Sequence, residues 1–237
     1  MAGINPEQFQ QLLGQLFAAI NNHEPAALAK INALLEKIPE EPNLLHLAGL
    51  ASADQNQLSA AIDYLLRSLS RQSEQPEVHN NLANVYAKQG NNLLAEKHYR
   101  QALQLNPDFQ DALKNLGLLL ISVSPEAAVV ELDRAIAQNS KDIGALTGLG
   151  DAHKALENFE LSTEYYQRAL EINPNHVTAR HNLALCYKLN EQLALATANY
   201  KIALGLAPKN AEIHYNYANA LFAVSYTHLR AHETRGN

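Results

Sequence analysis

Apolar residues recur along most of the chain at spacings of three and four, which places them on one face of an α-helix. The clearest stretch, residues 76–109, holds two such segments, with a turn at Gly90 between them and Pro107 at the end. Glycine suits a left-handed turn. Proline ends a helix because it lacks an N–H and restricts the residue before it. These 34 residues are therefore predicted to form an antiparallel pair of helices.

The same pattern returns along the chain with a period of 34 residues. When Pro76 is position 1, positions 7, 8, 11, 20, 24, 27 and 32 hold Leu82, Ala83, Tyr86, Ala95, Tyr99, Ala102 and Pro107. The frame from Val177 repeats this set as Leu183, Ala184, Tyr187, Ala196, Tyr200, Ala203 and Pro208. Small residues at positions 8, 20 and 27 are expected where the two helices approach most closely, and large residues at 7, 11 and 24 where they fill the gaps between hairpins.

The repeat suggests a division of the chain into three parts. Residues 1–41 are expected to form a divergent helix pair that keeps only the second half of the pattern. Residues 42–223 form the array, with frames starting near 42, 76, 110, 143, 177 and 211, of which the last is incomplete. The frame at 110 is one residue short, near Ser124.

Composition supports a helical chain and excludes several classes of protein. Hydrophobic residues make up 47%, enough for packed interfaces, and low Gly and Pro counts with no Trp favour helix over sandwich or barrel. The formal net charge of −6 argues against nucleic-acid and anionic-membrane partners. No signal peptide or long apolar run occurs, so we expect a cytoplasmic protein. The single cysteine, Cys186, excludes an intrachain disulfide and is expected to be buried and unreactive.

The repeated positions resemble the tetratricopeptide repeat (TPR) family over about residues 8–223. The resemblance implies an all-α, right-handed superhelical solenoid of antiparallel helix hairpins, with a concave groove lined by the first helix of each hairpin. A solenoid has no single core, because each repeat packs only on its neighbours. The alternative is an ordinary helical bundle with a closed core.

Asparagines recur at the positions that the resemblance assigns to the groove. Position 6 holds Asn81, Asn115, Asn182 and Asn216, and position 9 adds Asn84 and Asn219. Asparagine inside a helix costs a few tenths of a kcal/mol, so its recurrence needs a reason. An amide both donates and accepts hydrogen bonds, and a row of amides could pair with an extended peptide backbone. The row resembles the asparagine ladder of O-linked N-acetylglucosamine transferases. The alternative is that these side chains only bond neighbouring helices or water.

The groove also carries charges of both signs, with lysines at Lys88, Lys114, Lys154 and Lys188. A second function of the TPR family, capture of a C-terminal carboxylate, requires a lysine at position 5, where this chain has Asn80. Without that cation the charge-assisted bonds are missing.

No motif for catalysis, a metal or a cofactor is present. There is no glycine-rich phosphate loop or zinc motif, and His153 occupies an aromatic packing position. We therefore expect a non-catalytic scaffold that binds a protein or peptide. The alternative is the substrate-recruiting N-terminal region of a larger enzyme, because bacterial arrays of similar appearance precede sulfotransferase or O-linked glycosyltransferase domains.

The periodicity stops near Val224. Positions 20, 24 and 27 of the last frame would be Arg230, Thr234 and Asn237, none of which fits. Residues 224–237 resemble a translated sequencing adapter, so a non-native tail is expected; a natural divergent capping helix is the alternative. The face around Tyr217, Leu221 and Phe222 is then expected to lack a neighbour and to favour self-association.

Overall fold

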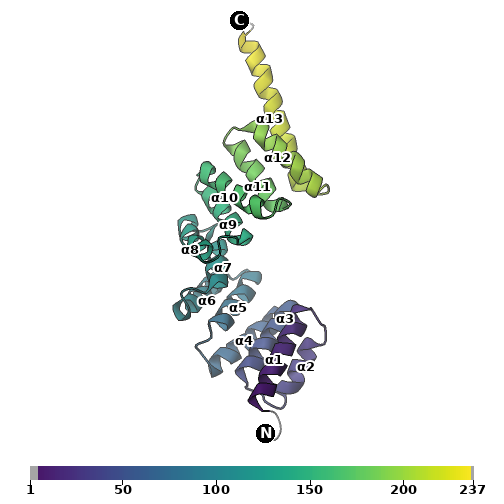
Figure 1. The fold of residues 1–237 in the computed structure, drawn as a ribbon, viewed down its shortest axis with the longest axis vertical. Helices are drawn as coiled ribbons and strands as arrows, with labels where there is room; N and C mark the ends of the chain where they lie inside the picture. Colours follow the sequence, from purple (N-terminus) through teal and green to yellow (C-terminus); the bar gives the residue numbers. More distant parts are fainter. Residues whose placement is uncertain (1–4, 236–237) are drawn as a thin grey trace. The chain divides into compact units, whose positions relative to one another are not determined.

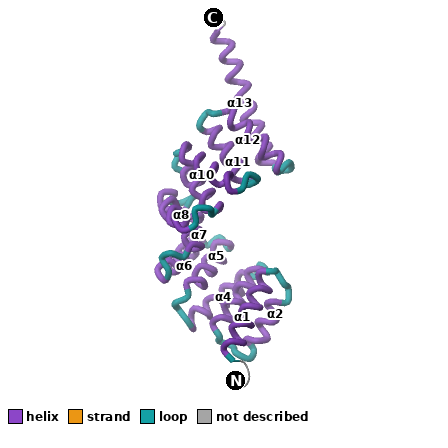
Figure 2. Tube along the Cα trace, in the orientation of Figure 1, coloured by secondary structure: helices purple, strands orange, loops and turns teal. Residues whose placement is uncertain are grey.

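The computed structural model describes residues 5–235, with side chains for residues 5–226. Within that range the chain forms thirteen α-helices and no strand (Figures 1 and 2). The expected all-α class is therefore confirmed. The helices are α1 (Pro6–Asn21), α2 (Ala27–Leu35), α3 (Pro42–Asp54), α4 (Leu58–Arg71), α5 (Pro76–Lys88), α6 (Asn92–Leu105), α7 (Gln110–Leu120), α8 (Pro125–Gln138), α9 (Ile143–Ala155), α10 (Phe159–Ile172), α11 (Val177–Leu189), α12 (Leu193–Leu206) and α13 (Ala211–Arg235).

Local sequence signals set the ends of these helices. Proline is the first residue of α3 and α5, where its missing N–H costs nothing. The Asp142 side chain caps α9 by accepting from the Ala145 N–H at 3.0 Å. The second helices α6, α10 and α12 each end two residues before a proline, as expected.

The turn within most hairpins uses one left-handed residue. Position 15 has a positive φ in four frames, at Asn56 (61°), Gly90 (84°), Glu157 (59°) and Glu191 (58°). Only Gly90 adopts this conformation without steric cost. In the frame of α13 the same position is Ser225, and the helix continues through it to Arg235.

The two helices of a hairpin pack closely at the predicted small positions. A Cβ added to Gly49 on α3 would lie 2.6 Å from the Leu65 Cγ on α4. Ala95 and Ala102 on α6 are fully buried, and so is Tyr166 at position 24 of a later hairpin. The hairpin geometry of a TPR solenoid is therefore confirmed.

The chain divides into two compact units, Met1–Leu116 and Gly117–Asn237, each of which is described by itself. In the first unit α3 contacts α5, but α4 and α6 do not meet. In the second unit α9 contacts α11 and α11 contacts α13, but α10 and α12 do not meet. Each unit is thus curved, with first helices on its inner side, and neither is a closed bundle.

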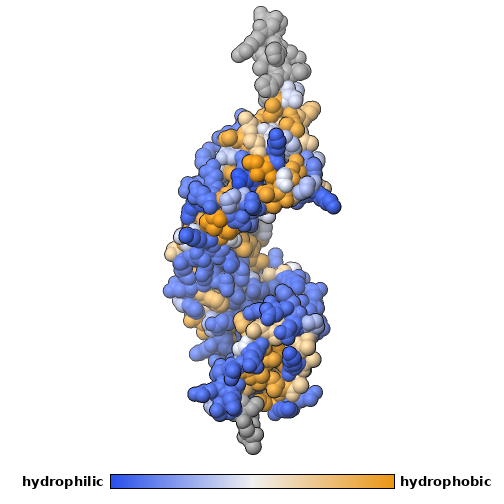
Figure 3. Space-filling view, turned by 45° about the vertical axis from the view of Figure 1, so that its right-hand side comes forward, coloured by the Kyte–Doolittle hydropathy of each residue, from blue (hydrophilic) through white to orange (hydrophobic). Residues whose placement is uncertain are grey.

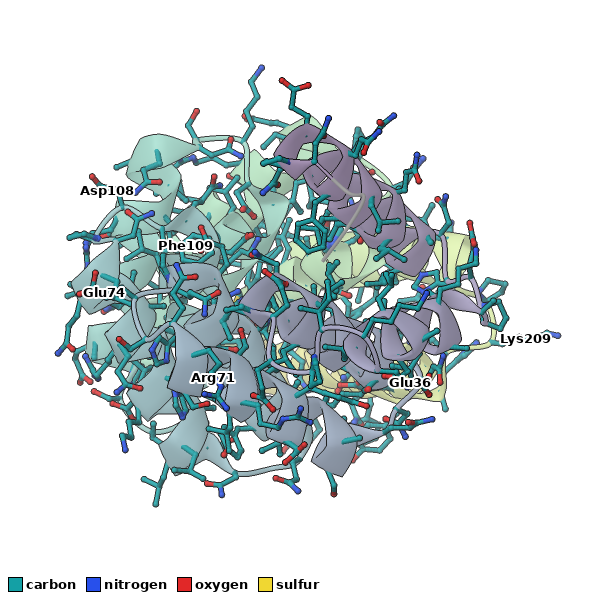
Figure 4. All side chains as sticks on the ribbon, turned by 90° about the horizontal axis from the view of Figure 1, so that it is seen from below. Glu36, Arg71, Glu74, Asp108, Phe109 and Lys209 are labelled. Atoms are coloured by element: carbon teal, nitrogen blue, oxygen red, sulfur yellow. The ribbon has the colours of Figure 1, made fainter. Side chains whose placement is uncertain are left out.

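Ion pairs join the end of α4 to the loop that leads from the first helix pair into α3. Arg67 and Arg71 on α4 bond Glu40, in the loop before α3, at 3.2 and 2.8 Å. The arginines lower the pKa of the Glu40 carboxyl below its usual value, chiefly through the Arg71 hydrogen bond. Arg71 and Glu74, labelled in Figure 4, mark the end of α4 and the loop to α5.

Candidate binding groove

The predicted asparagines of the first unit bond to the preceding first helix. The Asn81 Nδ2 lies 2.8 Å from the Nε2 of His46 on α3. The Asn115 Nδ2 donates to Asn80 Oδ1 at 3.3 Å and to Asn84 Oδ1 at 3.1 Å, both on α5. These amides therefore link α3 to α5 and α5 to α7.

The second unit repeats the arrangement with different partners. The Asn182 Nδ2 donates to the Asp151 Oδ1 on α9 at 3.0 Å. The Asn216 Nδ2 lies 3.0 Å from the Nε2 of His181 on α11. The Asn219 side chain is half-buried and makes no hydrogen bond to any described residue.

These bonds leave a regular set of groups free to bind a ligand. At position 6 the Nδ2 is used, and the Oδ1 of Asn81 and Asn216 has no partner in the described part of the chain. At position 9 the Asn84 Oδ1 is used twice, and its Nδ2 is free. Helices α5 and α13 therefore each present an acceptor at position 6 and a donor at position 9, three residues apart on one face.

A tyrosine from the second helix completes the position 9 contact in two hairpins. The Tyr99 hydroxyl donates to Asn84 Oδ1, and the Tyr166 hydroxyl to Asp151 Oδ1, both at 2.6 Å. Burial raises the pKa of Tyr99 to about 12, so its hydroxyl stays protonated. The third tyrosine, Tyr200, is fully buried, but its hydroxyl has no partner among the described residues. Position 9 of its hairpin is Leu185, which cannot accept a hydrogen bond.

Burial keeps the histidines at these contacts neutral. It lowers the pKa of His46 to about 4, although Glu77 opposes the shift. Burial also lowers the pKa of His181. A neutral Nε2 can accept from an asparagine Nδ2, so the direction of the Asn81 and Asn216 amides is set by their neighbours at neutral pH.

The four candidate lysines differ in whether their ammonium groups already form ion pairs. Lys154 pairs with Asp151 at 2.8 Å and Lys114 with Asp111 at 3.3 Å. The exposed Lys88 donates from α5 to the Ala53 carbonyl on α3 at 3.4 Å and has no ion pair within the described residues. Lys188, half-buried on α11, forms no hydrogen bond or ion pair with another described residue.

One depression opens on the inner side of the first unit, between α3 and α5. Its volume is about 380 Å³. Its lining includes three of the predicted site residues, Asn81, Asn84 and Lys88.

Sequence reasoning missed His46 and His181 at position 5 as partners of the amides, and treated Asp151 at position 9 only as one of the groove charges. The signal was present, because each lies in the frame 31 or 35 residues before an asparagine at position 6. The expected packing role of His153 is confirmed, since its ring stacks on Tyr165 with centroids 5.4 Å apart. Cys186 is buried, and burial raises the pKa of its thiol.

The face expected to lack a neighbour at α13 needs one correction. The Tyr217 ring packs on Tyr200 with centroids 6.3 Å apart, because position 7 faces the preceding hairpin. Leu221 and Phe222 are 43% and 74% exposed. Figure 3 shows apolar surface on the second unit beside the segment drawn in grey.

No group of three or more His, Cys, Asp or Glu side chains is arranged to bind a metal ion within the described residues. No helix in that range has the length and apolar character needed to cross a membrane.

Family models agree with the repeat. One model described as tetratricopeptide repeat matches residues 76–109 and 144–176, and a second with the same description matches residues 165–198. Among curated proteins, a DnaJ homolog subfamily C member 7 homolog of Schizosaccharomyces pombe is 31% identical over 112 residues, 45% of this chain and 24% of that protein. Human tetratricopeptide repeat protein 12 is 30% identical over 101 residues, 39% of this chain and 14% of that protein. The chain thus spans a quarter or less of the length of these relatives.

Solved structures show the same fold. A tetratricopeptide repeat protein from Parabacteroides merdae superposes with a TM-score of 0.74 at 20% identity, covering 92% of this chain and 87% of that one. YrrB, described as a TPR protein with an unusual peptide-binding site, superposes with a TM-score of 0.66 at 20% identity, covering 82% and 97%. The family models therefore show tetratricopeptide repeats at residues 76–109 and 144–198, and the solved structures show that the chain has the fold of tetratricopeptide repeat proteins.

Proposed function

We propose that the chain is a non-catalytic scaffold that binds an extended segment of a partner protein along the inner face of its first helices. A single observation carries the proposal: α5 and α13 each present a free amide oxygen at position 6 and a free amide nitrogen at position 9. A peptide unit in an extended chain offers the complementary N–H and C=O. The free groups pair with backbone, so binding depends little on the side chains of the partner.

The bonds between hairpins favour this role over a purely structural one. Each amide at position 6 uses its nitrogen to hold the preceding helix, which fixes the direction of its remaining oxygen. A fixed acceptor loses less entropy on binding than a mobile one. The same asparagines can therefore both stabilise the array and bind a ligand.

The test starts from a phage library of random 12-residue peptides selected on the intact chain. Enriched peptides are then synthesised and their affinities measured by fluorescence anisotropy. The informative variant is Asn84→Asp, which keeps the oxygen that accepts from Tyr99 and Asn115 but replaces the free donor. Asp151 already makes the equivalent contacts on α9, so the fold tolerates the change. Peptides bound in the first unit should weaken by about tenfold, through one lost bond and a repelled carbonyl.

The matched variant in the second unit is Asn219→Ala, because Asn219 holds no other described residue. Peptides bound there should weaken several-fold with an unchanged melting temperature. The control is Asn92→Ala, at the exposed start of the second helix α6. If every peptide binds both groove variants as tightly as the unsubstituted chain, the ladder plays no part in recognition.

Two further parts of the proposal concern context. We place the protein in the cytoplasm, with neither nucleic acid nor membrane as partner. The alternative, a substrate-recruiting region of a larger enzyme of sulfotransferase or O-linked glycosyltransferase type, is tested by reading the source gene across the codons for residues 224–237. Several hundred further codons of one reading frame would support the enzyme.

We also propose that the chain self-associates through α13. Tyr215, Leu221 and Phe222 are 70%, 43% and 74% exposed on this helix. Clustered apolar side chains of this kind favour association.

A further inference from the structure

The depression between α3 and α5 has an apolar floor and a polar rim. Its apolar lining, the floor, is Gly49, Leu50, Ala53, Leu65 and Val85, none of them exposed, and its polar lining, the rim, is Asp54, Asn81, Asn84 and Lys88, all exposed except the half-buried Asn81. All of these residues belong to the first unit. The depression therefore lies directly beside the free groups of Asn81 and Asn84 to which the proposed function assigns the partner backbone.

Leucine in place of tyrosine at position 24, which this hairpin shares with α7–α8 (Leu132), leaves room for the depression. In two later hairpins a tyrosine at position 24 reaches position 9 and fills the space between the helices, as Tyr99 does with Asn84. The α3–α4 hairpin has Leu65 and Leu50 at these positions. Leucine is shorter and has no hydroxyl, so the space stays open and its floor stays apolar.

The size of the depression suits one large side chain. Its volume is about 380 Å³. A buried apolar cavity of about 150 Å³ already binds benzene. A phenylalanine or leucine side chain could therefore enter while the backbone on either side stays at the amides of the rim.

The charges at the mouth differ in how far they are already satisfied. Asp54 contacts His23, with 2.6 Å between the Oδ1 and the Nδ1. The Lys88 ammonium reaches over the mouth to the Ala53 carbonyl at 3.4 Å and has no carboxylate partner in the described part of the chain. Asp54 therefore already accepts a hydrogen bond, whereas the Lys88 ammonium is bonded only to a carbonyl and keeps donors for an acidic residue in the partner.

We infer that this depression is a specificity pocket for a large apolar side chain, aromatic or leucine, next to an acidic residue in an extended segment of a partner protein. The inference rests on the proposed function and adds a sequence requirement to it. Recognition then has two parts, because the amides bind any backbone and the pocket selects the side chain.

The experiment uses the enriched peptides of the phage selection and versions in which the apolar residue is replaced by alanine. On the unsubstituted chain the alanine version should bind about tenfold more weakly or worse. Ala53→Leu fills the pocket from its edge, so the two versions should then bind within about twofold of each other. Ala87→Leu is the matched control, since Ala87 is the same frame position on α5 and does not line the depression. It should leave the tenfold preference intact.

The acidic neighbour is tested with Lys88→Glu, which should reverse the preference for an acidic over a basic residue in the peptide. Enriched peptides without a shared apolar residue, or an alanine penalty that persists in Ala53→Leu, would overturn the pocket. Peptides that weaken in Asn84→Asp but show no apolar preference would leave the proposed function standing and remove only the pocket. If no peptide responds to Asn84→Asp, the pocket fails, and if none responds to Asn219→Ala either, the proposed function fails with it.

Discussion

The buried tyrosines at position 24 allow one contact to be measured in three settings of the same molecule. Tyr99 donates to an amide, Tyr166 donates to a carboxylate, and the hydroxyl of Tyr200 has no described partner. Replacement by phenylalanine removes only the hydroxyl. A net hydrogen bond between neutral groups contributes about 1 kcal/mol and one to a charged group about 2 kcal/mol, whereas an unsatisfied buried hydroxyl costs about 1–3 kcal/mol.

The three substitutions should therefore change the free energy of unfolding by different amounts, and one of them in the opposite direction. Tyr99→Phe should lower the free energy of unfolding by about 1 kcal/mol, and Tyr166→Phe by about 2 kcal/mol. Tyr200→Phe should raise it by about 1 kcal/mol, because it removes a buried polar group that nothing satisfies. Repeat arrays need not unfold in a single step. Urea unfolding should therefore be combined with hydrogen exchange, which measures each hairpin separately.

A double-mutant cycle sharpens the test. Leu185→Asn places an amide at position 9 of the hairpin of Tyr200, at the same spacings that join Asn84 to Tyr99 and Asn115. In that background Tyr200→Phe should become destabilising, with a coupling energy of about 1 kcal/mol or more. If Tyr200→Phe destabilises the original chain as much as Tyr99→Phe does, the account of position 9 is wrong.

Three further predictions follow from burial, turns and exposed surface. Acidification should destabilise the fold, because the pKa of His46 falls from 6.5 to about 4 on folding and the unfolded state therefore binds the proton first. Stability that is present above pH 6.5 should be lost as the pH falls toward 4, by about 3 kcal/mol for this residue. Urea unfolding measured against pH should show a smaller loss in His46→Gln. Glu157→Gly should stabilise its hairpin by up to about 1 kcal/mol, because glycine adopts the φ of 59° without strain. Gly90→Ala should destabilise its hairpin by about 1 kcal/mol for the opposite reason. Shifts of the same sign in the thermal unfolding of the two variants would contradict this. Phe222→Ser should reduce self-association measured by light scattering, and a chain that is monomeric before substitution would refute that interface.

The fold could be predicted from the sequence because its rules are local and repeated. The small residue Ala95 and the large residue Tyr99 are both buried on α6, four positions apart, so their spacing in the chain encodes the buried face of that helix. Proline after the second helix, as at Pro107, acts through its own backbone. These signals need no knowledge of distant residues.

The groove was only partly predictable because its contacts join different repeats. The asparagines at position 6 were identified, but whether Asn81 meets a histidine or Asn182 an aspartate depends on the residue present at position 5 or 9 of the preceding hairpin. The depression beside Asn84 is lined by Leu65, at a position where two other hairpins have a tyrosine that reaches position 9. A missing side chain gives no motif to search for.

The bonds between position 6 and the preceding helix also limit how this array can be rearranged. Each hairpin must offer a hydrogen-bond acceptor at position 5 or 9 wherever the next hairpin has an asparagine at position 6. A duplicated or transplanted copy of residues 177–210, with Leu185 at position 9, would serve its new successor only through His181. Shuffling these modules, in the laboratory or in a genome, therefore requires matching donors to acceptors at each seam as well as preserving the length of the unit.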